Sequence, residues 1–297
     1  MGAEQNNAKS IKSLLDEYKF SFSKSKGQNF LIDKNIPEKI VRMSGIDSAC
    51  GVLEIGPGTG ALTLELCRAA GHVTAVELDK RLLPILNEVL SGIKNIDIVQ
   101  GDILKLDLKK LVSEKMPGYA HHICANLPYN ITTSAISSFI KADAFVTITV
   151  MVQKEVAKRI CAVPGSSDYG AFSVFINYHT EPSLLFDVPP GCFVPRPKVW
   201  SSVILMKSRT TRLLQSDEEK LFFRVVRASF AQRRKTIVNA LCSAFGNETE
   251  KEDIRRCVER SGLDPQIRGE SLSIADFSML SAELRRLFQT CIQTLKK

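Results

Sequence analysis

The sequence predicts an α/β protein in which a mostly parallel sheet carries helices on both faces, followed by a small all-α domain. Short apolar runs alternate with helical periodicity from about residue 35 to residue 207, as expected of successive βαβ units. A glycine-rich turn follows the first of these runs. Beyond Lys207 only helical patterns remain. We therefore expect one domain over residues 1–207, with an N-terminal segment at 1–34, and a second over residues 208–297.

Six apolar runs are the expected strands. They are Val52–Ile55, His72–Leu78, Ile96–Val99, His121–Ala125, Phe145–Val152 and Ser201–Met206. Helices are expected between several of them, for example at Thr63–Ala70 and Arg81–Leu90. No long helical pattern separates the late segments near Val174–Tyr178 and Ser201–Met206, so we expect both to form an antiparallel edge.

Charge, cysteine content and the lack of long apolar segments limit the classes of protein to which the chain can belong. The net charge of +8 suits a polyanionic partner, and it equally suits an ordinary basic enzyme. Eight cysteines without a C-x-x-C pair are typical of reduced, buried thiols in the cytoplasm, so we expect neither disulfides nor a metal site. The polar N-terminus lacks the apolar core of a signal peptide, and no stretch approaches the roughly 18 apolar residues of a membrane span.

The stretch VLEIGPGTGALTLEL reads as a strand, a glycine turn and a helix. Gly56, Gly58 and Gly60 allow a tight turn and the close approach of a ligand to the backbone. Glu77 ends the next apolar run, where a carboxylate can accept hydrogen bonds from ribose hydroxyls. With Ala61 in the last place of G-x-G-x-x-G/A, the pattern predicts an adenosine-containing cofactor and does not choose between NAD and S-adenosylmethionine.

Two further polar residues follow predicted strands and so belong at the carboxyl edge of the sheet, where open α/β sheets bind ligands. Asp102 ends the stretch IDIVQGD, where it can accept a hydrogen bond from an adenine amino group or cap a turn. Asn126 follows the run HHICA and precedes a proline turn. Position alone leaves the binding and the structural interpretation of Asp102 both open.

The tetrapeptide Asn126-Leu127-Pro128-Tyr129 combines groups that suit a planar amine. Pro128 biases Leu127 towards an extended conformation, which aims the Asn126 side-chain oxygen and the Leu127 carbonyl into the cleft. Two adjacent acceptors match an amine with two hydrogens, and the Tyr129 ring offers a face to a base. An amine held in this way can attack a sulfonium methyl group mainly through positioning. The alternative is a strand-end cap followed by a turn.

With these residues the chain resembles the small-subunit ribosomal RNA adenine dimethyltransferases over about residues 19–290. Seven stretches carry the resemblance: GQNFLID at 27–33, EIGPGTG at 54–60, VELD at 76–79, GDIL at 101–104, NLPYNI at 126–131, FVPRPKVWSSV at 193–203 and FAQRRKTIVNAL at 230–241. The resemblance implies a class I, Rossmann-like methyltransferase fold with a seven-stranded sheet and S-adenosylmethionine as cofactor. It also implies dimethylation at N6 of two adjacent adenosines in the 3′-terminal hairpin loop of the small-subunit (16S) RNA.

The same resemblance implies the roles of individual residues. At the cofactor it places Asn29, Leu31, Gly56, Gly58, Glu77, Asp102 and Asn126. Among these, Glu77 would take the ribose and Asp102 the adenine. At the target base it places Asn126, Leu127, Pro128, Tyr129 and Phe193, with Tyr129 and Phe193 as two facing rings.

The stretch RVVRASFAQRRKTIVNAL is rich in basic residues. By charge alone it fits a solvated helix face with one basic turn. The resemblance favours contact with RNA phosphates through Arg233, Arg234 and Lys235. Lys24 and Lys26 are candidates to extend this patch.

Other functions remain open on the same fold. One is a large-subunit RNA adenine methyltransferase of the macrolide-resistance type, and another is a non-catalytic ribosome-assembly or RNA-binding factor. The RRKT and PRPKVWS stretches look more like the small-subunit type, and the intact cofactor loop and tetrapeptide favour catalysis. Trp200 departs from the acid that many relatives carry at its position. The expected partner is the small ribosomal subunit, and a cytoplasmic monomer is the default expectation.

Overall fold

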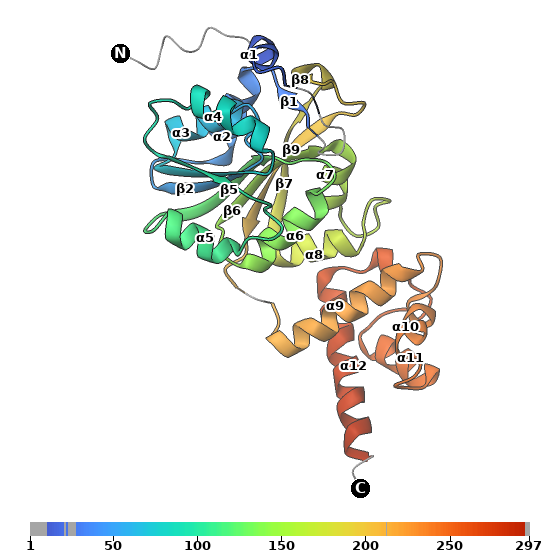
Figure 1. Cartoon of the computed structure of the whole chain (residues 1–297). Coiled ribbons are helices and arrows are strands. Elements are labelled where there is room, and N and C mark those ends of the chain that lie inside the picture. The colour runs from blue at the N-terminus through green and yellow to red at the C-terminus, as the bar shows by residue number, and fades with distance from the viewer. Residues whose placement is uncertain (1–10, 21, 23–27, 212, 295–297) are drawn as a thin grey trace. The chain divides into compact units, whose positions relative to one another are not determined.

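The computed structural model describes residues 11–20, 22, 28–211 and 213–294, and the chain divides into two compact units (Figure 1). The first comprises Met1–Ala157 and Glu181–Ser208, and the second comprises Lys158–Thr180 and Arg209–Lys297. Residues 158–180, expected in the first domain, group with the second because Val174 and Tyr178 are buried in its helical core.

The predicted fold class is confirmed: a seven-stranded sheet has the order β4-β3-β2-β5-β6-β9-β7. Its strands are β2 (Cys50–Ile55), β3 (His72–Glu77), β4 (Ile96–Gln100), β5 (Ala120–Asn126), β6 (Thr147–Gln153), β7 (Thr180–Val188) and β9 (Ser201–Ser208). Strands β2 to β6 pair in parallel, and β9 pairs antiparallel with β6. The carboxyl ends of four apolar parallel strands, β2 to β5, therefore meet at one edge.

Helices cover both faces of this sheet, with α2, α3 and α4 on one face and α5 and α6 on the other (Figure 1). The helices of the first unit are α2 (Asn35–Ser44), α3 (Ala61–Ala69), η3 (Lys80–Leu82), α4 (Leu83–Val89), α5 (Leu108–Lys115), α6 (Thr132–Ala142), α7 (Lys154–Ile160, which runs into the second unit) and η4 (Pro190–Cys192). Ile40 of α2 and Leu66 of α3 bury against Val52 and Val73 of the sheet. This packing follows from the apolar faces of both helices.

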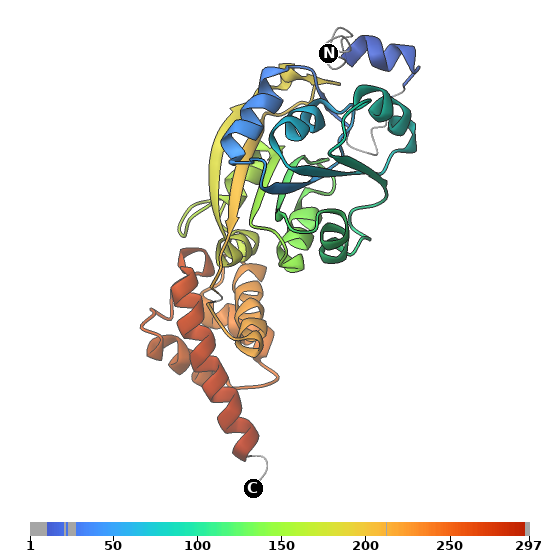
Figure 2. The same ribbon diagram turned by 90° about the vertical axis from the view of Figure 1, so that its left-hand side faces the viewer.

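The N-terminal segment folds onto the first unit. Helix α1 (Ile11–Glu17) buries Leu14 and Leu15 in a cluster with Leu82 and Ile85, beside α4 in Figure 2. Further along, β1 (Phe30–Leu31) pairs antiparallel with β8 (Phe193–Val194). The pairing fixes the segment before α2 at the carboxyl edge of the large sheet.

One predicted edge strand is wrong. Val174–Tyr178 lies within helix α8 (Ala171–His179), and the strand at the edge is β7 instead. In a run this short and this apolar, with Asn177 as its one polar residue, periodicity does not distinguish a helix from a strand. The Ser201–Met206 prediction is confirmed, because β9 is antiparallel to β6.

The second unit is helical. Besides α8 it contains α9 (Ser216–Ala231), α10 (Ile237–Phe245), α11 (Lys251–Arg260), η5 (Gly269–Ser271) and α12 (Ile274–Thr294). Its core includes Phe222, Leu241 and Phe277, all with 0% exposure. Over the described part of the chain, none of the helices is both long enough and apolar enough to pass through a bilayer.

Candidate active site

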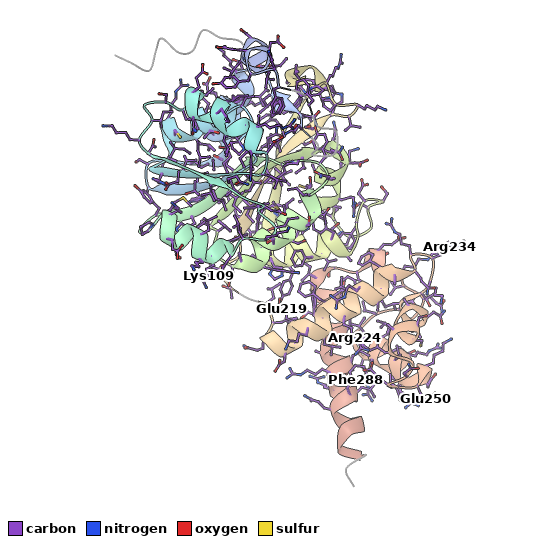
Figure 3. All side chains as sticks on the ribbon, in the orientation of Figure 1. Lys109, Glu219, Arg224, Arg234, Glu250 and Phe288 are labelled. Carbon is purple, nitrogen blue, oxygen red and sulfur yellow. The ribbon has the colours of Figure 1, made fainter. Side chains whose placement is uncertain are left out.

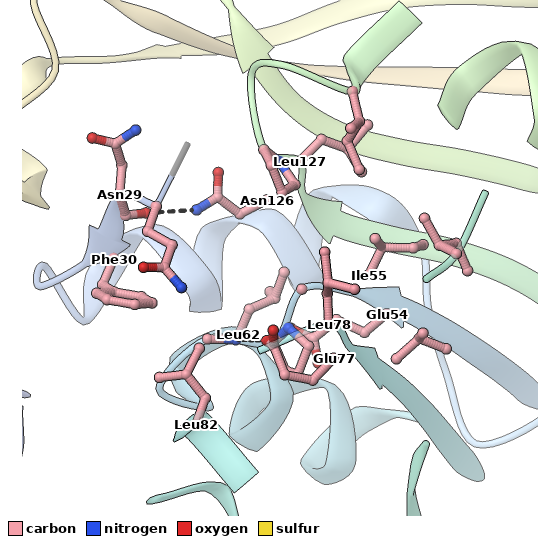
Figure 4. A pocket seen from close by; sticks show the side chains of 18 of the residues that line it. Asn29, Phe30, Glu54, Ile55, Leu62, Glu77, Leu78, Leu82, Asn126 and Leu127 are labelled. Carbon is pink, nitrogen blue, oxygen red and sulfur yellow. Dashed lines mark hydrogen bonds between the residues drawn. The ribbon is translucent and has the colours of Figure 1, made fainter. Parts of the chain in front are cut away.

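A pocket lies at the carboxyl ends of β2, β3, β4 and β5, where the sequence predicted a ligand site (Figure 4). Strands β2, β3 and β5 each reach the pocket with their final residue, and β4 reaches it through the turn that follows it. The predicted residues that line it are Asn29, Leu31, Gly56, Gly58, Glu77, Asp102, Asn126, Leu127, Pro128 and Tyr129. Their individual roles remain predictions, but the fold brings them together from five separate segments.

Phe193 is the exception among the predicted target-base residues. It pairs with Leu31 in the β1–β8 ladder, and its side chain is only 2% exposed within the core of the first unit. It does not line the pocket that contains Tyr129. In this structure Phe193 therefore supports the N-terminal wall of the site and offers no ring face to a base.

The glycine loop is shaped by an aromatic ring and a carboxylate. Gly56 and Gly58 have φ values of +64° and +62°, which L side chains rarely adopt. A Cβ atom at Gly58 would lie 2.8 Å from the ring of Phe30. Glu77 accepts hydrogen bonds from the N–H groups of Gly58 (3.3 Å) and Asp79 (2.7 Å). Glu77 thus holds the loop in place, a role that the sequence analysis missed.

The side-chain amide of Asn126 is oriented by the N-terminal segment. Its Nδ2 atom donates a hydrogen bond of 3.2 Å to the backbone carbonyl of Asn29, as drawn in Figure 4. Because this contact uses the nitrogen, the amide oxygen is left to act as an acceptor at the pocket. The contact joins residues that are far apart in the sequence, so no local pattern indicated it.

The turn that follows Asn126 is held on two sides. The Leu127 N–H donates to the carbonyl of Met151 in β6, at 3.1 Å, and the Leu127 side chain is buried. The Tyr129 hydroxyl lies 2.8 Å from the hydroxyl of Ser201. Burial raises the pKa of Tyr129. The contact with Ser201 holds the ring beside the pocket.

Carboxylates give the pocket its electrostatic character. Glu54 is 1% exposed, and its Oε2 atom has no hydrogen-bond partner among the described residues. Burial, with a smaller contribution from nearby Glu77, raises the pKa of Glu54 to about 8. Burial likewise raises the pKa of Glu77. Glu54 was not predicted, although an acid inside the apolar run VLEIG is a visible signal. A ligand that brings hydrogen-bond donors or positive charge would satisfy these groups.

The pocket also has apolar walls that the sequence analysis missed. Leu78 and Ile103 line it, and Leu78 is 54% exposed despite its size. Leu78 directly follows Glu77, and Ile103 directly follows Asp102, the two acidic residues predicted to bind the cofactor. Apolar side chains beside a few convergent polar groups are typical of sites that bind an aromatic ring such as adenine.

The basic turn lies in the second unit, between α9 and α10. The guanidinium of Arg233 donates to the carbonyls of Ser167 (2.9 Å) and Tyr169 (3.2 Å) and lies 3.4 Å from Glu270. Arg234, labelled in Figure 3, is exposed at this turn, as is Lys235. Arg233 is therefore engaged within the protein. Within the described part of the chain, the Lys235 ammonium donates only to the Ser243 hydroxyl, at 3.3 Å, so Arg234 and Lys235 remain the stronger phosphate candidates. Lys24 and Lys26 lie outside the described residues.

Known proteins resemble this chain over most of its length. A family model described as ribosomal RNA adenine dimethylase matches residues 19–281. A relative named ribosomal RNA small subunit methyltransferase A, from Alkaliphilus oremlandii (strain OhILAs), is 42% identical over 282 residues and covers 95% of this chain and 98% of the relative. A relative of the same name from Geobacillus thermodenitrificans (strain NG80-2) is 45% identical over 281 residues, with coverages of 94% and 96%.

Two solved structures extend the comparison. A dimethyladenosine transferase from Plasmodium falciparum matches with a TM-score of 0.73 and 25% identity, over 86% of this chain and 98% of that one. The 23S rRNA methyltransferase ErmE matches with a TM-score of 0.67 and 25% identity, over 86% and 99%. Both likenesses span the sheet and the helical region.

The contact of Phe30 with Gly58 can be tested by comparing two alanine substitutions. Gly58→Ala and Gly92→Ala both place a side chain at positive φ, which costs about 1–2 kcal/mol. Nothing lies within 4 Å of a Cβ atom at Gly92, whereas Gly58→Ala also collides with Phe30. We expect Gly58→Ala to lower the free energy of unfolding by roughly 1–3 kcal/mol more than Gly92→Ala, measured by urea denaturation. Equal losses would contradict the contact.

Because the pKa of Glu54 is raised, we expect the free energy of unfolding to depend on pH. Its pKa rises from 4.5 in the unfolded chain to about 8 in the folded chain, so the folded state holds the proton more tightly. Stability then falls as pH rises from about 4.5 to about 8. We expect Glu54→Gln to be more stable than the parent protein at pH 8 by on the order of a few kcal/mol, and to match it near pH 4.5.

Thermal unfolding across this pH range measures the difference between the two proteins. Glu114→Gln, at an exposed position on α5, is the matched control and should follow the parent curve. Parallel curves for Glu54→Gln and the parent protein would show that Glu54 does not titrate in this way.

Proposed function

The chain belongs to the ribosomal RNA adenine dimethylase family and is a ribosomal RNA methyltransferase, and from this premise we propose that its substrate is the small ribosomal subunit. There it dimethylates N6 of two adjacent adenosines in the 3′-terminal hairpin loop of the 16S RNA, with S-adenosylmethionine as methyl donor. The names of the relatives from Alkaliphilus oremlandii and Geobacillus thermodenitrificans support the choice of subunit. We also propose that the chain works as a cytoplasmic monomer.

One observation carries this proposal. Asn126 ends β5 at the same pocket as the glycine loop, and its amide is oriented by the Asn29 carbonyl. A site that holds a cofactor and a base amine on opposite sides of one transferred group needs such an arrangement. The neighbouring Tyr129 ring, fixed through Ser201, supports a planar substrate.

The residues of the pocket fit S-adenosylmethionine. The cofactor carries an ammonium group, ribose hydroxyls and an adenine amine, and the carboxylates of Glu54, Glu77 and Asp102 are acceptors for such donors. We assign the ribose to Glu77 and the adenine to Asp102, between the apolar side chains of Leu78 and Ile103. When bound, the cofactor supplies an electrophilic methyl group on a positive sulfonium.

The chain's own residues then activate the target nitrogen by holding it. The Asn126 amide oxygen and the Leu127 carbonyl accept the two hydrogens of the adenine amine, which directs the nitrogen lone pair out of the ring plane and towards the methyl group. Tyr129 stacks on the base and limits its motion. Most of the rate enhancement comes from this positioning and from the electrostatics of a site shielded from water. The first transfer is completed by release of one proton from the amine to water. One N–H then remains, so one acceptor suffices for the second transfer.

The proposal is tested by methyl transfer from labelled S-adenosylmethionine to unmethylated small subunits, with large subunits and naked RNA assayed in parallel. We expect dimethyladenosine in the small subunit alone. Asn126→Ala should lower kcat by about 100-fold or more, the scale seen when one oriented polar group is lost from an active site. Asn87→Ala, at an exposed position on α4, is the matched control.

Other outcomes of this assay identify the alternatives. Label in large-subunit RNA would assign the chain to the macrolide-resistance type of enzyme. Cofactor binding without transfer to any RNA would point to a non-catalytic binding factor.

We expect the basic residues of this turn to have two different roles, RNA binding and stabilisation of the second unit. Arg234→Gln and Lys235→Gln should weaken small-subunit binding and each lower the slope of log K against log salt by about 0.7–0.9. Arg233→Gln should instead lower the stability of the second unit, because two backbone carbonyls lose their donor. Arg255→Gln, with a side chain about as exposed as that of Arg233, is the control. A change in salt slope for Arg233→Gln without loss of stability would reverse the assignment.

A further inference from the structure

Trp200 is the single tryptophan of the chain, and 49% of it is exposed. It immediately precedes β9, next to Val199, which is 40% exposed. Since β9 is antiparallel to β6, with Ser201 opposite Gln153, the start of β9 lies at the carboxyl end of β6. Trp200 therefore lies at the edge of the sheet that carries the active site, and the proposed chemistry does not use it.

The backbone that carries this ring is fixed where it enters β9. The Trp200 carbonyl accepts a hydrogen bond of 2.9 Å from the Lys154 N–H. The next residue, Ser201, has 0% exposure, and its hydroxyl lies 2.8 Å from that of Tyr129. Trp200 is thus one residue, about 3.8 Å along the backbone, from a direct contact of the proposed base-stacking ring. A large aromatic side chain on an immobile backbone is a preorganised surface for a flat ligand.

Cationic side chains lie near the ring. The Lys154 ammonium lies 5.6 Å from the centroid of the Trp200 ring, and its charge is paired with Asp187 at 2.5 Å. Arg196 and Lys198, both exposed, occupy the loop just before Trp200. An exposed aromatic ring among cations suits a nucleotide, because the base can stack on the ring while the phosphate meets a positive charge.

We propose that Trp200 is a stacking platform for an unpaired RNA base that flanks the target adenosine. This inference rests on the proposed function, in which a single-stranded loop presents the adenosine to the pocket. A base drawn out of a stack leaves its neighbour without a partner on one side, and an aromatic ring can replace that partner. Trp200 thereby contributes to the recognition of single-stranded RNA without touching the transferred methyl group.

Because the chain has one tryptophan, fluorescence excited at a wavelength that the five tyrosines do not absorb reports this ring alone. The probe is an RNA hairpin with two adjacent adenosines in its loop, titrated into the full-length protein. We expect saturable quenching of the emission by the hairpin. A fully paired RNA of the same length and charge should leave the emission unchanged, because it offers no unpaired base.

Kinetics on small subunits give a second, independent readout. Trp200→Ala should raise KM for the subunit about tenfold or more, the scale of one stacked base, while kcat changes less than twofold. Trp200→Phe should recover most of the loss, and Val199→Ala should behave as the parent protein. An unchanged KM for Trp200→Ala in an enzyme that methylates small subunits would overturn the platform and leave the proposed function intact.

The two measurements also distinguish RNA binding at Trp200 from methyl transfer. Quenching by the hairpin but not by paired RNA, in a protein that methylates no subunit, would show that an unpaired base stacks on Trp200 and would remove the proposed function. Absence of quenching by either RNA, with the Trp200→Ala KM unchanged, would assign the ring a purely structural place beside Lys154.

Discussion

The site depends on the ring of Phe30 lying against the bare backbone of Gly58, where a Cβ atom would come within 2.8 Å. This close approach lets the N-terminal segment lie across the carboxyl edge of the sheet, where Phe30 pairs with Val194. From there the carbonyl of Asn29 reaches the amide of Asn126. A contact between a ring and a glycine therefore couples the cofactor loop to the residue that would hold the target base.

The same edge concentrates carboxyl groups in an apolar setting. Glu54, Glu77 and Asp79 are each at most 5% exposed, and burial raises the pKa of both glutamates. The backbone N–H groups of Gly58 and Asp79 donate to Glu77, but Oε2 of Glu54 has no hydrogen-bond partner among the described residues. Such a pocket is less stable empty than an apolar one would be, which is typical of binding sites that are completed by their ligand.

Much of this arrangement could be predicted from the sequence, because local rules determine it. The period of the apolar runs predicted the parallel strands, and the ends of those strands located Glu77, Asp102 and Asn126 at one edge. The features that could not be predicted depend on tertiary contacts. The run at Val174–Tyr178 is short and has only one polar residue, Asn177, so only its packing against other helices identifies it as helical. The burial of Phe193 and the contacts of Arg233 with carbonyls 66 and 64 residues away depend on partners that no local pattern reveals.

The hydrogen bond between Asn29 and Asn126 limits how the sequence and the length of the N-terminal segment can vary among relatives. The acceptor is a backbone carbonyl, so the side chain at position 29 can be exchanged in evolution without loss of this contact. Chain length is under a stricter constraint. In the short ladder of Phe30 and Leu31 with Val194 and Phe193, one inserted or deleted residue would turn each side chain to the opposite face. We therefore expect relatives to tolerate substitutions at position 29 far more readily than insertions or deletions in this segment.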